Sequence, residues 1–438
     1  DPLYCDRAGG DFTLRGDSPC AVANNPGCGQ IGAMPVGCTG SYLVRPDGSG
    51  DFATIQEAID AAVAGETIVL ADGTFTGPGN RDLSFLGKAI TIRSQAGDAD
   101  ACVISCQGSP SAPHRGIDFV SGETAASVLE DVTIQGAWMN TGAGGRISAG
   151  SPILRRVVFR DCDGVDGGGL AISGGATPSL DGCVFEGCDV TDAAGAIYVS
   201  ASWPQIRDCT FRSNTATWGG GAVYHQAAAP NYLDCVFEND ASAHWGGAVH
   251  NRYIDSGVHF FDCVFVGNTA PQGGAVYNRN EATPSFTTCT FTGNASPNGA
   301  VLHTRSAAQT TMIRCRLTFS PEGAAVTSDG TGAVTFFCSD LYGNAGGDWV
   351  GCIAGQLGVS DNFSADPDYC GPADDNYMLA NVSPCSPAHS PCGFVVGALA
   401  EGCALSDAPD PGAAPPAALV LEPNVPNPFN PMTTIVFA

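Results

Sequence analysis

A cysteine returns at a nearly fixed spacing through the middle of the chain, and this repeat limits the folds that the chain can adopt. The intervals between successive cysteines are 26, 26, 28, 26 and 26 residues. These cysteines are Cys183, Cys209, Cys235, Cys263, Cys289 and Cys315. A period of this length is typical of solenoids, in which each unit packs only against its neighbours. We expect Cys338 to add a looser copy, and Val132 and Val157 to extend the column backwards.

Large apolar residues hold two further places in the repeat. Two residues after the column come Ile134, Phe159, Phe185, Phe211, Phe237, Phe265, Phe291 and Leu317. Three residues before it come Leu154, Leu180, Ile206, Tyr232, Phe260, Phe286 and Met312. Residues i and i+2 of a strand share a face, so Cys209 and Phe211 should both point inward. The sequence therefore predicts an all-β, right-handed parallel β-helix over residues 41–365, since a β-sandwich would not keep one period over six copies.

Turn residues recur in phase with these strands. Asparagines that suit a repeated corner are Asn214, Asn239, Asn268, Asn294 and Asn344. A tight Gly-Ala step follows at 195–196, 221–222, 247–248, 274–275, 299–300 and 323–324. Glycine permits a close approach of backbones there.

The segment Phe211-Arg212-Ser213-Asn214, followed by Gly220-Gly221-Ala222, resembles the repeat of pectin-lyase-like β-helices. It is most similar to the polymorphic outer-membrane-protein type found on bacterial surfaces. The resemblance covers about residues 42–365. It implies the β-helix fold and an extracellular or cell-surface location, but no particular activity.

A short amphipathic helix is expected to cover the open first coil. Thr54 and Glu57 form a capping box, Ile55 and Ile59 lie on one apolar stripe, and Gly65 ends the helix. This stretch resembles the start of pectinesterases, whose Gln/Asp/Asp/Arg catalytic set does not follow on later coils. We therefore interpret it as an N-terminal cap without catalytic activity.

Residues 1–40 repeat residues 366–403. Ser18-Pro19-Cys20 matches Ser383-Pro384-Cys385, and both segments resemble the closing segment of a β-helix. The first copy has no rod before it, so either the sequence is a window from a longer tandem protein or the chain joins a neighbour end to end. We expect such self-association. No signal peptide precedes Asp1, which indicates a mature or trimmed form.

Residues 404–422 are expected to form a linker, and residues 423–438 resemble the first strand of a bacterial C-terminal Ig-like sorting domain. The resemblance rests on the Asn427-Pro428-Phe429-Asn430-Pro431 run before the apolar strand.

The cysteines of the irregular, Pro-rich ends are expected to form disulfides, which indicates an oxidising, extracellular compartment. The disulfide candidates are Cys5, Cys20, Cys28, Cys38, Cys162, Cys188, Cys370, Cys385, Cys392 and Cys403. Their connectivity stays open, although Cys162 and Cys188 on neighbouring turns suit a bridge.

A net charge of −26 argues against nucleic acid and anionic membranes as partners. No run of 18 apolar residues occurs, so we expect no membrane insertion.

Polar and aromatic side chains recur beside the Gly-Ala steps. The carbohydrate-binding candidates are Trp218, Trp245, Tyr224, His225, His250, Tyr277 and Arg279. On stacked coils they would form a stripe able to bind sugar, and the alternative is an ordinary solvated face.

Catalytic motifs of the Ser-hydrolase, zinc-protease and P-loop types are absent, and no catalytic residue is assigned. Asp208, Asp234 and Asp262 precede ladder cysteines, where they would bond backbone N–H groups or supply one carboxylate of a glycosidase pair. No cofactor is expected apart from a calcium ion, for which the candidates are Asp161, Asp163 and Asp189.

Three functions remain open on the sequence. The first is a structural or adhesive surface rod that assembles end to end into filaments. The others are a carbohydrate-binding module and a polysaccharide lyase or hydrolase. A groove with convergent Arg and Asp side chains would favour the enzyme, and an aromatic strip without them the binder.

Overall fold

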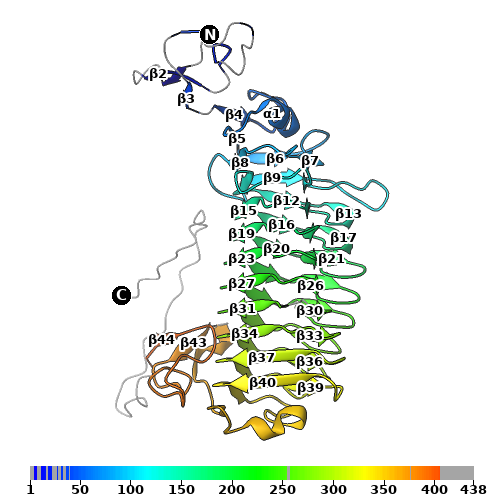
Figure 1. Cartoon of the computed structure of the whole chain (residues 1–438), viewed down its shortest axis with the longest axis vertical. Helices are drawn as coiled ribbons and strands as arrows, with labels where there is room; N and C mark the ends of the chain where they lie inside the picture. Colours follow the sequence, from blue (N-terminus) through cyan, green and yellow to red (C-terminus); the bar gives the residue numbers. More distant parts are fainter. Residues whose placement is uncertain are drawn as a thin grey trace, which may run out of the picture.

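The rod is built from four parallel sheets whose strands repeat once per coil (Figure 1). The computed structural model describes residues 40–253, 257–374 and 376–404, and before them 4–6, 11–15, 18–21, 27, 31–32 and 36–38. Every strand of these four sheets pairs in parallel with the equivalent strand of the next coil, as β24 does with β28. The predicted all-β parallel β-helix is confirmed.

The sheets are numbered here in the order in which the chain enters them. Sheet 1 comprises β4 (Ser41–Val44), β5 (Thr67–Leu70), β8 (Thr91–Ser94), β11 (Val128–Glu130), β15 (Ile153–Arg155), β19 (Ser179–Asp181), β23 (Gln205–Arg207), β27 (Asn231–Leu233), β31 (His259–Phe261), β34 (Ser285–Thr287), β37 (Gln309–Ile313) and β40 (Ala333–Phe337). Sheet 2 comprises β6 (Gly73–Phe75), β9 (Cys102–Ser105), β12 (Thr133–Gln135), β16 (Val158–Arg160), β20 (Val184–Glu186), β24 (Thr210–Arg212), β28 (Val236–Glu238), β32 (Val264–Val266), β35 (Thr290–Thr292), β38 (Arg316–Thr318) and β41 (Asp340–Tyr342). Sheet 3 comprises β7 (Leu83–Ser84), β10 (Ile117–Phe119), β14 (Gly145–Ser148), β18 (Leu170–Ser173), β22 (Ile197–Ser200), β26 (Val223–Gln226), β30 (Val249–Arg252), β33 (Val276–Arg279), β36 (Leu302–Thr304) and β39 (Val326–Ser328). Sheet 4 is shorter and comprises β13 (Trp138–Thr141), β17 (Asp163–Asp166), β21 (Asp189–Val190), β25 (Thr215–Ala216) and β29 (Ala241–Ser242).

The core consists of identical side chains stacked from coil to coil. Phe211 lies 4.6 Å from Phe237 between ring centroids, and Phe237 lies 4.6 Å from Phe265, with the rings nearly parallel. All three are fully buried. Such offset stacks add to the free energy gained from burying the rings, so the predicted phenylalanine column stabilises the rod along its length.

The predicted asparagine corner is a buried ladder. Asn268 donates its side-chain amide to Asn294 Oδ1 at 3.0 Å and to the carbonyl of Phe237 at 3.0 Å. Asn214 and Asn344 donate to the carbonyls of Phe185 and Leu317 in the same way. The prediction for Asn239 was wrong by one residue, because Asn239 adopts a left-handed turn with φ 56° and Asp240 takes the buried place.

Helix α1 (Ile55–Ala61) covers the first coil beside β4 and β5, as predicted (Figure 1). Thr54 is its N-cap and accepts a hydrogen bond from the N–H of Glu57. The helix ends at Ala61 with Ala62 as C-cap, earlier than Gly65, which instead adopts a positive φ in the following turn. No helix in the parts of the chain that the structure describes is long and apolar enough to span a membrane.

The six ladder cysteines are buried free thiols, as predicted. Cys338 does not continue their column. It adopts the left-handed turn position with φ 49°, Ser339 takes the ladder place with its Oγ accepting from the N–H of Cys315, and Cys338 forms a disulfide with Cys392.

Several disulfide predictions need correction. Cys162 and Cys188 are buried free thiols. In-register stacking points both side chains the same way, and their S–H groups donate to carbonyls of the preceding coil. Cys20 and Cys385 are also free. Cys370 pairs with Cys403. The side chains of Cys5, Cys28 and Cys38 lie outside the described residues.

The rod ends in two short 3-10 helices and a small sheet. Helix η2 (Gly351–Gln356) lies across the last coil, and η3 (Pro372–Asp374) follows β42 (Tyr369–Gly371). Strands β42, β43 (Asn376–Ala380) and β44 (Glu401–Cys403) form a sheet on the flank of the last coils, against β35 and β38 (Figure 1). Near the start of the chain, β1 (Tyr4–Asp6), β2 (Asp11–Arg15) and β3 (Val36–Cys38) form a second three-stranded sheet. The predicted linker and sorting-domain strand, residues 404–422 and 423–438, lie outside the described residues from 405 onward.

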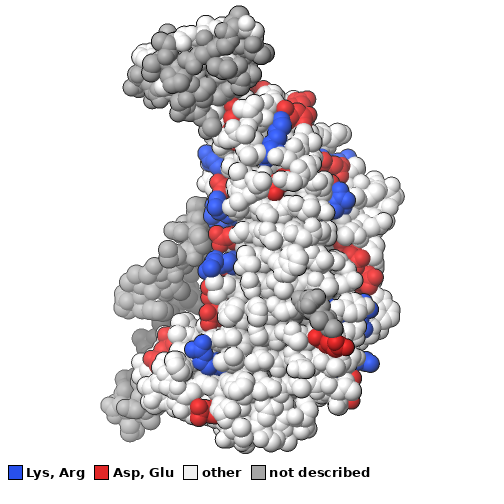
Figure 2. All heavy atoms as spheres, viewed as in Figure 1, with Lys and Arg blue, Asp and Glu red and all other residues white. Residues whose placement is uncertain are grey.

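Charged side chains are few on the face shown in Figure 2, where they gather in two bands along the edges of the rod. Only 14% of the residues are charged, so any place where opposite charges converge on the flank stands out.

Candidate functional site

The outward face of sheet 3 carries a column of aromatic rings. Tyr198, Tyr224, His250, Tyr277 and His303 occupy equivalent positions on β22, β26, β30, β33 and β36. Tyr198 and Tyr224 stack at 5.4 Å, and His250 stands edge-on between Tyr224 and Tyr277 at 4.8 and 5.0 Å. The alternation of side chains along a strand puts every member on one face, so the column follows from the repeat.

A second column runs beside the first, two residues further along each strand. It consists of Gln226, Arg252 and Arg279 in register. Arg252 donates from Nη1 to the hydroxyl of Tyr224 at 3.2 Å. Arg279 lies over the ring of Trp245, with its Cζ 4.7 Å from the ring centroid, which is a cation–π contact. The Nε of Arg279 is buried without a hydrogen-bond partner.

The opposite wall comes from the ends of sheet 4. Asp192 and Trp218 hold equivalent places on successive coils, and the Trp218 N–H donates to Asp192 O at 2.9 Å. Asp166, at the end of β17, and Trp245 lie in the neighbouring column, one residue further along the coil. Trp218 is 46% exposed and stacks on His244 at 4.1 Å. Trp245 packs on Tyr277 at 5.8 Å.

The two walls enclose a groove of about 380 Å³. It is lined by Asp166, Asp192, Ala193, Tyr198, Trp218, Tyr224, Gln226, Trp245, His250, Arg252 and Arg279. Aromatic faces, two guanidinium groups and two carboxylates therefore converge on one hollow in the flank of the rod.

Burial shapes the protonation of these groups. The pKa of Asp166 is raised by burial and then by the neighbouring charge of Asp192. Burial also raises the pKa of Tyr198 to about 12. The pKa of His250 is lowered by burial and by the charges of Arg279 and Arg252, so its ring is neutral near pH 7. The groove thus offers fixed cations and a carboxylate that takes up a proton more readily than usual.

The structure brings together five of the seven predicted carbohydrate-binding residues: Trp218, Trp245, Tyr224, His250 and Arg279. His225 points inward instead, where it is fully buried and bonded to Asn251 Oδ1 and the Tyr232 hydroxyl. Tyr277 is fully buried beneath Trp245. Because side chains alternate along a strand, His225 points to the opposite face from its neighbour Tyr224. Applying this alternation to each residue would have removed His225 from the carbohydrate-binding candidates.

The sequence analysis missed Asp166 and Asp192 as groove residues. Asp192 stands three residues before the Gly step of its coil, as Trp218 does, and Asp166 stands two residues before, as Trp245 does. Aligning the Gly steps would therefore have placed both aspartates in the columns of the tryptophans. Gln226 was missed as well, although it shares its column with Arg252.

The calcium candidates do not assemble into a ligand set. Asp163 accepts the N–H of Asp189, Asp161 accepts from the Gln135 amide, and Asp189 accepts from the Thr215 hydroxyl. Within the described ranges, no three His, Cys, Asp or Glu side chains gather as a metal site.

The three aspartates that precede ladder cysteines occupy left-handed turns. Asp208, Asp234 and Asp262 have φ of 52, 53 and 53° and stack on successive coils. Burial and then the charge of Asp234 raise the pKa of both Asp208 and Asp262. They lie at the corner between sheets 1 and 2 and do not line the groove.

Comparisons with known proteins agree with the observed architecture. Residues 111–252 match the model of the right-handed β-helix region, and residues 262–279 match the Chlamydia polymorphic membrane protein repeat. No curated protein matches the chain.

Similar solved structures include a mannuronic acid specific polysaccharide family 6 lyase from human gut microbiota, at 12% identity and a TM-score of 0.39. That match covers 82% of this chain and 96% of the lyase. Pectin methylesterase from carrot matches at 14% identity and a TM-score of 0.28, over 74% of this chain and 88% of the esterase. From its sheets and its family match, the chain is a right-handed parallel β-helix protein, with a segment that resembles a polymorphic membrane protein repeat.

Proposed function

We propose that the protein is an extracellular surface rod that binds anionic glycans in the groove between sheets 3 and 4. The observation that carries this proposal is the convergence of exposed Trp218, stacked Tyr224 and the cation of Arg279 on one hollow. The two disulfides and the similarity to a surface-protein repeat support the extracellular location.

The chemistry of the groove matches a sugar chain that bears acidic groups. Aromatic faces accept the C–H face of a pyranose ring, and polar groups around them fix its orientation. No carboxylate of the described residues forms an ion pair with Arg279. A carboxylate or sulfate on the sugar would pair with its planar guanidinium in two parallel hydrogen bonds.

The test is affinity electrophoresis of the intact chain through gels that contain a neutral, a uronate-based or a sulfated polysaccharide. We expect retardation in one or both anionic gels, and its loss in the Arg279→Gln variant. Arg93→Gln, on sheet 1 away from the groove, is the matched control and should migrate like the parent chain. Equal migration of all variants in every gel would exclude the proposal.

A second candidate function is cleavage of the bound polysaccharide, which the pair of carboxylates in the groove favours. Glycoside hydrolysis needs two carboxyl groups, one of them with a raised pKa, and Asp166 has this property beside Asp192. Release of reducing or unsaturated ends, abolished in Asp166→Asn and Asp192→Asn, would establish it. Binding without any product would leave the protein a binder.

End-to-end self-association is a further part of the proposal. Its support is the pair of three-stranded sheets, β1–β3 and β42–β44, near the two ends of the described chain. A head-to-tail contact that does not close into a ring would generate filaments.

A further inference from the structure

Residues 366–403, here called the C-terminal module, dock on the outer flank of the last coils. Gly397 donates its N–H to the carbonyl of Arg314 at 2.7 Å. Ala398 donates its N–H to Thr290 Oγ1 at 2.9 Å. Val396 is fully buried in a cluster that contains Cys338 of the rod and Tyr369, Leu379 and Cys385 of the module. The module thus covers side chains of β35 and β38 that would otherwise face solvent.

The centre of this contact is Arg316, a fully buried cation on the outer side of β38. It donates from Nη2 to the carbonyl of Leu399 at 3.1 Å and lies 5.2 Å from the ring of Tyr369. The Tyr369 hydroxyl pairs with Thr318 Oγ1 at 2.9 Å, and the Cys385 thiol donates to Asp340 Oδ2 at 3.4 Å.

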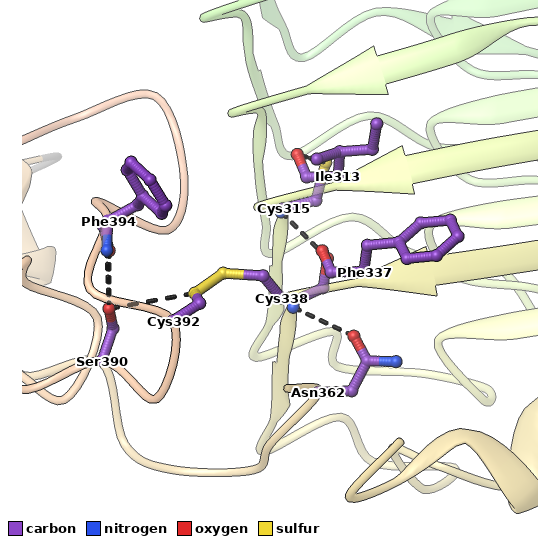
Figure 3. The surroundings of a disulfide bond; sticks show 9 residues. Ile313, Cys315, Phe337, Cys338, Asn362, Ser390, Cys392 and Phe394 are labelled. Carbon is purple, nitrogen blue, oxygen red and sulfur yellow. Dashed lines mark hydrogen bonds between the residues drawn. A yellow bond between two sulfur atoms is a disulfide. The ribbon is translucent and has the colours of Figure 1, made fainter. Parts of the chain in front are cut away.

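A disulfide locks the module in place. Figure 3 shows Cys392, in the loop that carries Ser390 and Phe394, bonded to Cys338 at the end of β40. The flank is therefore occupied by a tethered and cross-linked segment of the same chain.

The sheet β1–β3 repeats the architecture of the C-terminal module in detail. In the antiparallel pair β1–β2, Tyr4 lies opposite Leu14 and Asp6 opposite Asp11. In the antiparallel pair β42–β43 of the C-terminal module, Tyr369 lies opposite Leu379 and Gly371 opposite Asn376. In the parallel pair β2–β3, Leu14 lies opposite Val36 and Arg15 opposite Cys38. In the parallel pair β43–β44, Leu379 lies opposite Glu401 and Ala380 opposite Cys403. Both pairs carry a register shift at the same place in the two modules.

The loops between these strands are also equivalent. Cys20 donates its N–H to Ser18 Oγ at 3.1 Å, and Cys385 donates to Ser383 Oγ at 3.1 Å. Ile31 donates its N–H to the carbonyl of Cys20 at 2.9 Å, and Val396 donates to Cys385 at 3.0 Å. The described residues between 4 and 38, here called the N-terminal module, therefore follow the same plan as the docking unit.

The N-terminal module keeps the residues that make the docking contacts. In sequence, Ile31-Gly32-Ala33 aligns with Val396-Gly397-Ala398, which meets the flank. Glycine is required at position 397, because a Cβ there would collide with the guanidinium of Arg316. Gly32 has a similar positive φ, 105° against 95° for Gly397. Yet Ile31 is 52% exposed where Val396 is 0% exposed.

We propose that the N-terminal module is a docking unit for the flank of a second β-helix rod, and that a second copy of this chain serves as that partner. The site on the second copy is the surface that its own C-terminal module covers, centred on Thr290, Arg314 and Arg316. This inference gives contact residues to the end-to-end association proposed above, and it is independent of the glycan groove.

The partner cannot be the flank of the same chain, since the C-terminal module already occupies it. An intramolecular partner competes at a high effective concentration, and the disulfide strengthens its position. The intact chain is therefore closed to a second copy until its own module is released. Release exposes the flank and converts the chain into a head-to-tail building block.

The experiment releases the C-terminal module and follows association. In the full-length Cys392→Ser/Val396→Asp variant, alkylation of Cys385 reports release, and sedimentation velocity reports mass. We expect concentration-dependent association, and its loss when Ile31→Asp is added. Val120→Asp, which places the same charge on another exposed apolar side chain, should leave association intact.

Two results would overturn the inference. A released variant that stays monomeric at all concentrations would do so, as would association that survives Ile31→Asp. If the double variant loses its β-sheet circular dichroism, Cys392→Ser alone is tested with and without Ile31→Asp, under the same criteria. Glycan binding, measured on the same samples, should be unchanged by Ile31→Asp, so that a failure of the groove and a failure of docking are distinguished.

Discussion

Asp240 is a fully buried carboxyl group whose pKa is shifted by its place in the rod. It replaces an asparagine in the buried ladder, and its Oδ1 accepts from the N–H and the side-chain amide of Asn214. Its Oδ2 has no hydrogen-bond partner. In the other coils, the atom in that place is an amide nitrogen that donates to a phenylalanine carbonyl. A protonated carboxyl group can donate there as well, whereas a carboxylate cannot.

This position gives a pH-dependent stability. Burial raises the pKa of Asp240 to about 8 from its ordinary 3.8, so the folded state holds a proton that the unfolded state releases. The free energy of unfolding should therefore fall as pH rises between about 4 and 8. Asp240→Asn removes the contribution of this group. The free energy of unfolding of the variant, relative to that of the parent, should therefore rise by on the order of 3 kcal/mol from pH 5 to pH 7. Denaturant unfolding at both pH values measures it, and a constant difference would refute it.

At the scale of single elements, the cysteine ladder is a column of thiols that solvent reaches only when coils open. Cys209, Cys235 and Cys263 are buried and donate to backbone carbonyls of their own coil. Cys352, on η2, is the exposed thiol of the described residues. Burial removes access and disfavours the thiolate that reacts.

Alkylation should therefore separate the two kinds of cysteine. In the folded chain we expect iodoacetamide to modify Cys352 at least about 100-fold faster than the ladder thiols, because the latter need unfolding of their coils. Peptide mass spectrometry assigns the modified sites. After denaturation without reductant, all the ladder thiols should react with iodoacetamide. Ladder cysteines that stay unmodified under these conditions would mean that they are oxidised in the protein.

The strands and their inward columns could be predicted from the sequence because one coil repeats one pattern. Burial of Phe211 and Phe237 follows from period and alternation alone. Corner residues could be placed less accurately than strand residues, because Cys338 and Asn239 adopt left-handed turns that shift the register by one residue. Such a turn is rare for residues other than glycine and leaves little trace in a hydrophobic pattern.

At the scale of the whole molecule, the groove depends on how sheets 3 and 4 face each other. The sequence identified Trp218, Trp245 and Arg279, which stand out by residue type. Repeat alignment could place Asp166 and Asp192 in the columns of the tryptophans, but it could not show that these columns face the arginines of sheet 3. The length of sheet 4 and the angle of its corner are tertiary properties. The similarity of the two modules was predictable from the repeated segments, whereas the docking surface around Arg316 was not.

The central claim is that the groove binds anionic glycan through its aromatic wall. Isothermal titration of the full chain with the anionic polysaccharide that retards it in gels tests this claim most directly. Trp218→Ala should weaken binding about 10-fold or more. Trp203→Ala is the matched control, because Trp203 is 48% exposed, against 46% for Trp218, but lies outside the groove. We expect weakened binding for Trp218→Ala and parental affinity for Trp203→Ala. Equal affinities for both variants would contradict it.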